Sequence, residues 1–172
     1  MKNSIILSFF MLIISFPLTA QQKSFVKSQM VEASADDVWE RLRTLDGLEN
    51  FAPQLISDSW VHDKKAPGVG CVRSCTAAGM KKGEASYSEK ITKFSDAERF
   101  YQYEVFEGTP TVNMVNSLRV TDLGYKKSMV TWTSTRDGFV KNPQMTEDQF
   151  DAFLETAGQS VLNGLASLYA SN

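Results

Sequence analysis

The spacing of apolar residues divides the chain into strand-like and helix-like parts. Apolar residues at helical spacing follow Ser34, which can cap a short helix while Asp37 returns the contact as in a capping box. A second helical turn covers residues 48–51. The intervening stretches favour extended backbone and are joined by short turns. They predict seven antiparallel strands, over residues 25–33, 55–62, 70–77, 84–94, 99–106, 113–121 and 127–136.

The last element has a helical period. From Thr146 to Tyr169 apolar residues recur every three or four positions, which predicts one long amphipathic helix capped by Thr146. Strands followed by a long helix predict an α+β fold, in which a curved seven-stranded antiparallel sheet wraps around the helix and two short helices follow strand 1. The small residues Ala157, Gly158 and Gly164 leave a cavity if they face the sheet. Close helix packing on a filled core explains the same pattern, so periodicity leaves both open.

The N-terminal segment differs from the rest of the chain. Lys2 precedes an uncharged, almost wholly apolar run over residues 5–18, which is shorter than the ~20 residues of a spanning helix. Ala20 is followed by two glutamines, as at a cleavage site. We therefore expect residues 1–20 to be a signal peptide, and residues 21–172 to be a single ligand-binding domain that is periplasmic or secreted. An uncleaved membrane anchor is the alternative.

Charge and cysteine spacing narrow the possible functions. The formal net charge is −2 at pH 7 with both signs interspersed, so no basic stripe indicates nucleic acid or a membrane surface as a partner. Cys71 and Cys75 lie in a predicted strand, where residues four apart are separated by ~13 Å, beyond the ~7 Å reach of a disulfide. We expect two free thiols. His62 is the sole histidine, and we expect no metal and no cofactor.

The order of several motifs resembles the SRPBCC, or START-like, superfamily of helix-grip proteins, to which the birch-pollen allergens belong. The motifs are residues 31–39, 67–73, 117–121 and 130–132, together with the long terminal helix. The nearest group that the chain resembles, over residues 25–169, is the polyketide cyclase/dehydrase and lipid-transport branch. The resemblance implies a pocket between the helix and the sheet for a lipid, polyketide or other small hydrophobic molecule.

Residues 70–120 also resemble the plant abscisic-acid receptors, through Gly-Cys-x-Arg at 70–73 and the spacing to Glu107. The gate and latch loops of the receptors are replaced here at residues 78–82 and 110–112, and their hormone-binding lysine falls at Ser57. These departures argue against hormone binding of the receptor type. The resemblance still implies that two loops frame the mouth of the pocket.

Matching positions in the superfamily imply the wall of the ligand-binding pocket. Period two places Tyr103 with Val105, and Trp132 with Ser134, on shared strand faces. A place in the packed core is the alternative for any single aromatic residue. The implied wall residues are Cys75, Ala77, Glu89, Tyr103, Val105, Val112, Val115, Ser117, Trp132, Ser134, Phe153, Ala157 and Val161.

Arg73 and Glu89 are the charged candidates for ligand binding. Burying an unpaired charge costs several kcal/mol, so charged residues inside a pocket indicate a purpose. If both point inward from adjacent strands, they pair with each other or bind the carboxylate and hydroxyl of a ligand. A position of one of them at the solvent-exposed rim of the sheet is the alternative.

Three functions remain open. A binding protein or carrier for a small hydrophobic ligand comes first because it needs only the cavity. A cyclase/dehydrase-type enzyme for a polyketide-like substrate needs an acid or base, for which Glu89, Tyr87 and Tyr103 are candidates. An interaction module with a vestigial cavity is third, and it predicts a filled core.

Overall fold

The computed structural model describes residues 22–64 and 66–170, so the predicted signal peptide lies outside the described residues. Seven strands form one antiparallel sheet in the order β1-β8-β7-β5-β4-β3-β2. Their bounds are β1 Lys23–Val31, β2 Ile56–Val61, β3 Val72–Ala77, β4 Tyr87–Ser95, β5 Phe100–Glu107, β7 Met114–Gly124 and β8 Lys127–Arg136. All seven lie within or close to the predicted ranges.

A few elements differ from the prediction. Two-residue strands, β6 (Thr111–Val112) and β9 (Gly138–Phe139), form a separate ladder that is too short to leave a pattern in the sequence. Of the two predicted short helices, the first is α1 (Ala35–Arg43) and the second is a single 3₁₀ turn, η1 (Leu48–Asn50). A further 3₁₀ turn, η2 (His62–Lys64), follows β2.

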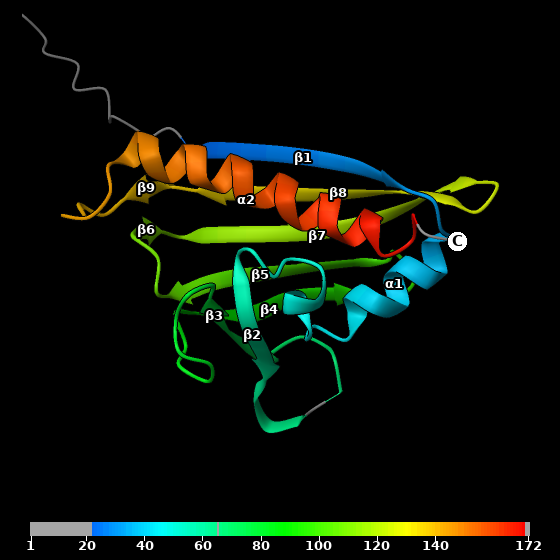
Figure 1. Cartoon of the computed structure of the whole chain (residues 1–172), viewed down its shortest axis with the longest axis horizontal. Helices are drawn as coiled ribbons and strands as arrows, with labels where there is room; N and C mark the ends of the chain where they lie inside the picture. The colour runs from blue at the N-terminus through cyan, green and yellow to red at the C-terminus, as the bar shows by residue number, and fades with distance from the viewer. Residues whose placement is uncertain (1–21, 65, 171–172) are drawn as a thin grey trace, which may run out of the picture.

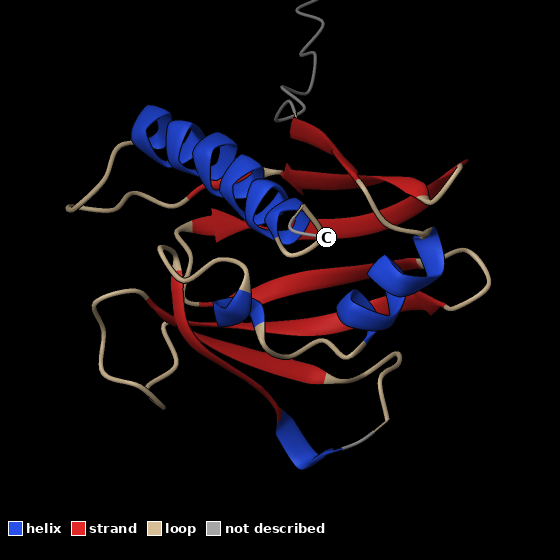
Figure 2. Ribbon diagram, turned by 45° about the vertical axis from the view of Figure 1, so that its right-hand side comes forward, coloured by secondary structure: helices blue, strands red, loops and turns tan. Residues whose placement is uncertain are grey.

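The sheet curls around the long helix α2 (Glu147–Ser167), which confirms the predicted α+β helix-grip architecture. Figure 1 shows α2 running along β1 and β8, while η1 and β2 lie toward the opposite edge of the sheet. Helix α1 packs against β7 and β8. In Figure 2 the helices lie on the same concave side of the sheet. The hydrophobic core lies on this concave side, because the apolar residues of the strands alternate toward it.

Both predicted helix caps are present. Thr146 and Gln149 form a complete capping box at the start of α2, each side chain accepting a hydrogen bond from the other residue's backbone N–H. The Ser34 hydroxyl accepts a hydrogen bond from the Asp37 backbone N–H at 3.2 Å and donates one to the Asp37 carboxylate at 2.6 Å. The Asp37 carboxylate thus contacts the Ser34 hydroxyl, because an aspartate is one methylene shorter than the glutamate of a full capping box.

Two glycines let α2 pack closely on its surroundings. A Cβ atom at Gly158 would collide with the Trp132 ring, and one at Gly164 would collide with the backbone carbonyl of Phe51. Helix α2 therefore packs closely at Gly158 and Gly164, as one of the two alternatives left open by the sequence predicts. Ala157 and Gly158 also line a cavity.

The first turn of α2 is fixed to the sheet by charged residues. Arg136 of β8, 1 % exposed, donates hydrogen bonds to Glu147 at 2.9 Å and to Asp151. Lys23 of β1 pairs with the same two carboxylates at 3.0 and 2.7 Å. Hydrogen bonds from Arg136 and Lys23 lower the pKa of Glu147. Burial raises the pKa of Asp151, but the hydrogen bonds from Lys23 and Arg136 outweigh it and leave that pKa lowered.

Both cysteines are free thiols, as the spacing predicted. Only Cys75 lies in a strand, because Cys71 belongs to the turn before β3, where its thiol contacts the Ala66 carbonyl at 3.2 Å. Among residues 22–64 and 66–170, no helix has the length and apolar character needed to cross a membrane.

Candidate functional site

A cavity of about 370 Å³ lies between α2, the concave face of the sheet and the segment around η1 and β2. This volume lies within the range of ~300–1,000 Å³ that is typical of small-molecule sites. Its wall is mainly apolar, and the apolar residues come from all three parts of the fold. They are Leu48, Leu55, Ile56, Val105, Met114, Leu118, Trp132, Phe150, Phe153, Leu154, Ala157 and Val161.

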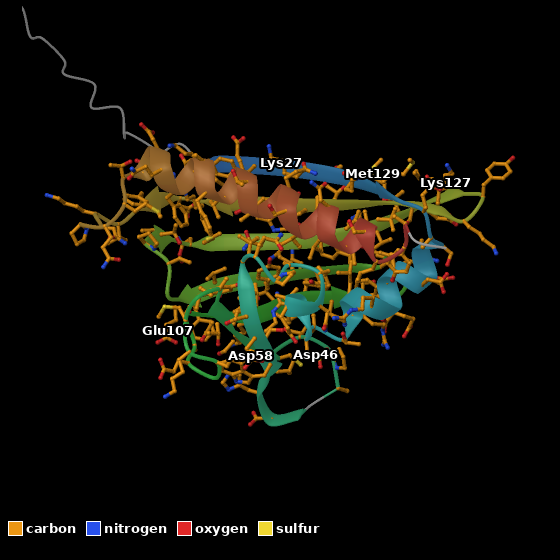
Figure 3. All side chains as sticks on the ribbon, viewed as in Figure 1. Lys27, Asp46, Asp58, Glu107, Lys127 and Met129 are labelled. Carbon is orange, nitrogen blue, oxygen red and sulfur yellow. The ribbon has the colours of Figure 1, made fainter. Side chains whose placement is uncertain are left out.

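Two loops line one end of the cavity. Residues 108–110 follow β5, and Asn142, Gln144 and Met145 precede α2. In Figure 3 Glu107 marks this end of β5, while Lys127 lies at the opposite end of the sheet. Of the two loops implied by the receptor resemblance, residues 110–112 contribute Pro110. None of residues 78–82 lines the cavity, and the loop before α2 takes that role.

Arg73 and Glu89 face each other on adjacent strands inside the fold. They are paired in register on β3 and β4 and are 2 % and 3 % exposed, so the alternative of a solvent-exposed rim position is wrong. Arg73 Nε donates a hydrogen bond to Glu89 Oε2 at 2.7 Å, and Nη1 donates one to the Leu45 carbonyl at 3.0 Å. The guanidinium also lies 5.3 Å from the centre of the Tyr103 ring. The pair is thus held by two other parts of the fold, the segment at Leu45 and strand β5.

Burial and charge act against each other at this pair. Burial acts to lower the pKa of Arg73, but the charge of Glu89 outweighs it, and that pKa lies well above its ordinary value. Burial raises the pKa of Glu89, and Arg73 opposes the rise. Arg73 therefore keeps its proton and needs the Glu89 carboxylate as its counter-ion. The two residues bring no net charge to the cavity.

The two candidate tyrosines line the cavity beside this pair. Burial, followed by the charge of Glu89, raises the pKa of Tyr87 and of Tyr103 well above the ordinary value for a phenol. Both phenols therefore remain protonated at neutral pH, where they serve as hydrogen-bond donors and not as bases. Across the described part of the chain, no group of three or more His, Cys, Asp or Glu residues is arranged to hold a metal ion.

The expected wall of β7 is wrong by one position. Met114, Asn116 and Leu118 line the cavity, and Val115 and Ser117 face away from it. Because side chains alternate along a strand, a one-residue error in matching reverses the face. The alternation of apolar Leu118 and Val120 with polar residues was the sequence signal for the correct face.

The remaining predicted wall residues fall into two groups. Cys75 and Ser134 are fully buried but do not reach the cavity, whereas Ala77 lies at the end of β3 and Val112 is exposed in β6. Eight of the fourteen predicted binding residues line the cavity: Arg73, Glu89, Tyr103, Val105, Trp132, Phe153, Ala157 and Val161.

Asn116 is a polar residue among the cavity residues that sequence reasoning missed. It lies in the middle of the sheet, in register with Tyr103 of β5 and Ser134 of β8. Its side chain lines the cavity and is 5 % exposed. Among the described residues, neither Asn116 Oδ1 nor Ser134 Oγ has a hydrogen-bond partner. Buried polar groups are nearly always paired, so this exception needs a reason.

Solved structures share this architecture. The protein XoxI from Bacillus cereus has a TM-score of 0.70 and 19 % identity, over 86 % of this chain and 96 % of that one. A protein from Nitrosospira multiformis has a TM-score of 0.68 and 22 % identity, over 87 % and 97 %. An aromatase/cyclase from a Streptomyces species has a TM-score of 0.70 and 18 % identity, over 87 % and 94 %. At these identities the likeness shows the fold alone.

Sequence comparison identifies the family. A search of curated proteins finds no match. The model of the family described as polyketide cyclase/dehydrase and lipid transport matches residues 22–169, nearly the whole described chain. The chain therefore belongs to the polyketide cyclase/dehydrase and lipid-transport family of the SRPBCC superfamily.

Proposed function

We propose that the protein is a binding protein or carrier for a small hydrophobic molecule, which it holds in the cavity between α2 and the sheet. The observation that carries this proposal is a mainly apolar cavity of about 370 Å³ whose charged residues already neutralise each other. Apolar walls favour an apolar ligand because binding removes both surfaces from water. Family membership supports the same conclusion.

A cyclase/dehydrase-type enzyme is the second candidate, because a structural neighbour is named an aromatase/cyclase. General acid–base catalysis is most effective when the catalytic pKa lies near the working pH. The raised pKa values of Tyr87 and Tyr103 and the pairing of Glu89 with Arg73 disfavour such catalysis here. We therefore place binding before catalysis.

The cavity proposal is tested by filling it from α2. Ala157 is half-buried and lines the cavity, so Ala157→Trp should occupy the space and abolish uptake of an apolar fluorescent probe while the protein stays folded. Ala152→Trp is the matched control, because Ala152 is exposed on the same helix and does not line the cavity. Probe titration and thermal melting of the wild type and both variants provide the measurement.

The opposite result is also defined. In a filled core, Ala157→Trp would overpack the interior at a cost of about 1–3 kcal/mol. A clear loss of melting temperature in this variant, together with no probe uptake by the wild type, would contradict the cavity and the binding function.

We also infer that the protein acts outside the cytoplasm, on the basis of the apolar run before Ala20. The processed chain should begin at Gln21. N-terminal mass analysis of the protein from its own host tests this, and an intact Met1 in the membrane fraction would contradict it.

A further inference from the structure

We propose that Asn116 is the hydrogen-bonding anchor of the cavity, and that the ligand is an uncharged molecule with a hydroxyl group on an otherwise apolar body. This inference rests on the proposed function, because it specifies the chemistry of the molecule that the cavity binds. It is carried by three observations: the unpaired amide oxygen of Asn116, the closed charge pair of Arg73 with Glu89, and the apolar residues that surround both.

The side chain of Asn116 is one of the few polar groups in the wall of the cavity. Asn116 lines the cavity in the middle of β7, between Tyr103 and Ser134 of the neighbouring strands. Its Oδ1 is buried without a hydrogen-bond partner in the described part of the chain. A leucine of similar size would avoid the cost of burying this group unpaired. Keeping an asparagine here makes sense if a bound molecule supplies the missing donor.

A hydroxyl group fits this amide better than other polar groups. An ether or a ketone can only accept a hydrogen bond, from Nδ2, and would leave the oxygen of Asn116 without a donor. A hydroxyl both donates and accepts, so it also satisfies the amide after a half-turn that exchanges Oδ1 and Nδ2. The ligand therefore presents an alcohol or a phenol to Asn116.

The charge of the cavity excludes an anionic ligand. Arg73 is the only cationic residue among the described residues that line the cavity. Its guanidinium is already bonded to Glu89 and to the Leu45 carbonyl. A ligand carboxylate would be buried without a counter-ion or would have to displace Glu89. Of the two alternatives for Arg73 and Glu89, the structure shows the mutual pair, which disfavours their binding the carboxylate and hydroxyl of a ligand.

The test compares three two-ring probes of similar size near neutral pH: 2-naphthol, 2-methylnaphthalene and the 2-naphthoate anion. Fluorescence titrations give the affinity of each for the wild type and for Asn116→Leu. We expect the substitution to weaken 2-naphthol binding about fivefold or more, the loss of one net hydrogen bond, and to leave 2-methylnaphthalene binding equal or tighter. Naphthoate should bind the wild type more weakly than either neutral probe.

Ser128→Ala is the matched control. Ser128 Oγ is also buried without a partner in the described chain. Ser128 lies in β8, on the same face of that strand as Trp132, but it does not line the cavity. This variant should leave the affinities for all three probes unchanged. Thermal melting of each variant completes the set. Asn116→Leu should melt at the wild-type temperature or above it, because it removes an unpaired polar group.

Each contrary result has a distinct meaning. Equal effects of Asn116→Leu on the two neutral probes, or tightest binding of naphthoate, would overturn this inference while leaving the proposed function intact. A loss of several degrees in melting temperature would show that Asn116 has a structural role and would also overturn it. Failure of the wild type to bind any of the three probes would overturn the proposed function itself.

Discussion

Two sites on the concave sheet face treat buried polar groups in opposite ways. On β3 and β4, Arg73 and Glu89 neutralise each other and are bonded further to the backbone. On β7 and β8, Asn116, Ser128 and Ser134 each bury an oxygen that has no partner among the described residues. Paired groups hold the fold together, because removing either partner leaves the other charge buried without a counter-ion. Unpaired groups cost stability in the free protein, and a ligand can recover that cost.

The largest effect is expected from breaking the paired site, Arg73 with Glu89. Glu89→Leu should lower the free energy of unfolding by about 3–5 kcal/mol, because it leaves the Arg73 guanidinium buried without its counter-ion. Urea unfolding at neutral pH measures this. The double variant Arg73→Met with Glu89→Leu should regain most of the loss, since it removes both charges. Wild-type stability in Glu89→Leu alone would show that the pair does not hold the fold.

A smaller effect is expected where α2 packs on β8, beside the unpaired site. Gly158→Ala should destabilise the protein by about 1–3 kcal/mol, because the new methyl group collides with the Trp132 ring. The better helix propensity of alanine offsets up to about 1 kcal/mol of this. Gly68→Ala is the control, since a Cβ there meets no atom within 4 Å. Equal melting temperatures for both variants would show that α2 is free to move away from β8.

The smallest effect is a change of stability with pH, and it comes from Cys75 on β3, next to the paired site. Burial, followed by the charge of Glu89, raises the pKa of the Cys75 thiol on β3 from 9.0 to about 12. The folded protein therefore keeps this proton when the unfolded chain has released it. Stability should fall with rising pH between these two values, by up to about 1.4 kcal/mol per pH unit.

The contribution of Cys75 is isolated by Cys75→Ala. Tyrosines with raised pKa values add their own alkaline slope in both proteins, so the difference between the two slopes belongs to the thiol. Urea unfolding from about pH 8 to about pH 10 gives both slopes. Parallel slopes would contradict the raised pKa of Cys75.

Local sequence signals predicted most of the fold. The caps at Ser34 and Thr146 and the alternating strands depend on residues close in the chain, so they could be read from the sequence. The ladder of β6 with β9 joins residues 111–112 to residues 138–139, a long-range pairing that two-residue segments do not encode. The turn at η1 depends on packing and on Gly47 at φ 67°.

The candidate site was predicted less completely than the fold. Arg73 and Glu89 were predicted because a charged residue is costly to bury in a strand without a partner. Their in-register pairing on β3 and β4 shows that they are partners. Asn116 was missed because a polar residue in a strand usually faces solvent. Its burial depends on the face that β7 presents, and matching positions placed that face one residue away.

The charged cluster at the start of α2 has a consequence for how fast a ligand exchanges. Arg136 and Lys23 fix the end of the helix that adjoins residues 142–145, one of the two loops that line one end of the cavity. Helix α2 could open the cavity as a lid only if its first turn were free to move, and here ion pairs hold that turn to β1 and β8. Entry and exit of a ligand would then depend on motion of the two loops, and loops move on the ns–μs timescale. The loops would therefore set the residence time of a ligand, and the cavity wall would set its affinity.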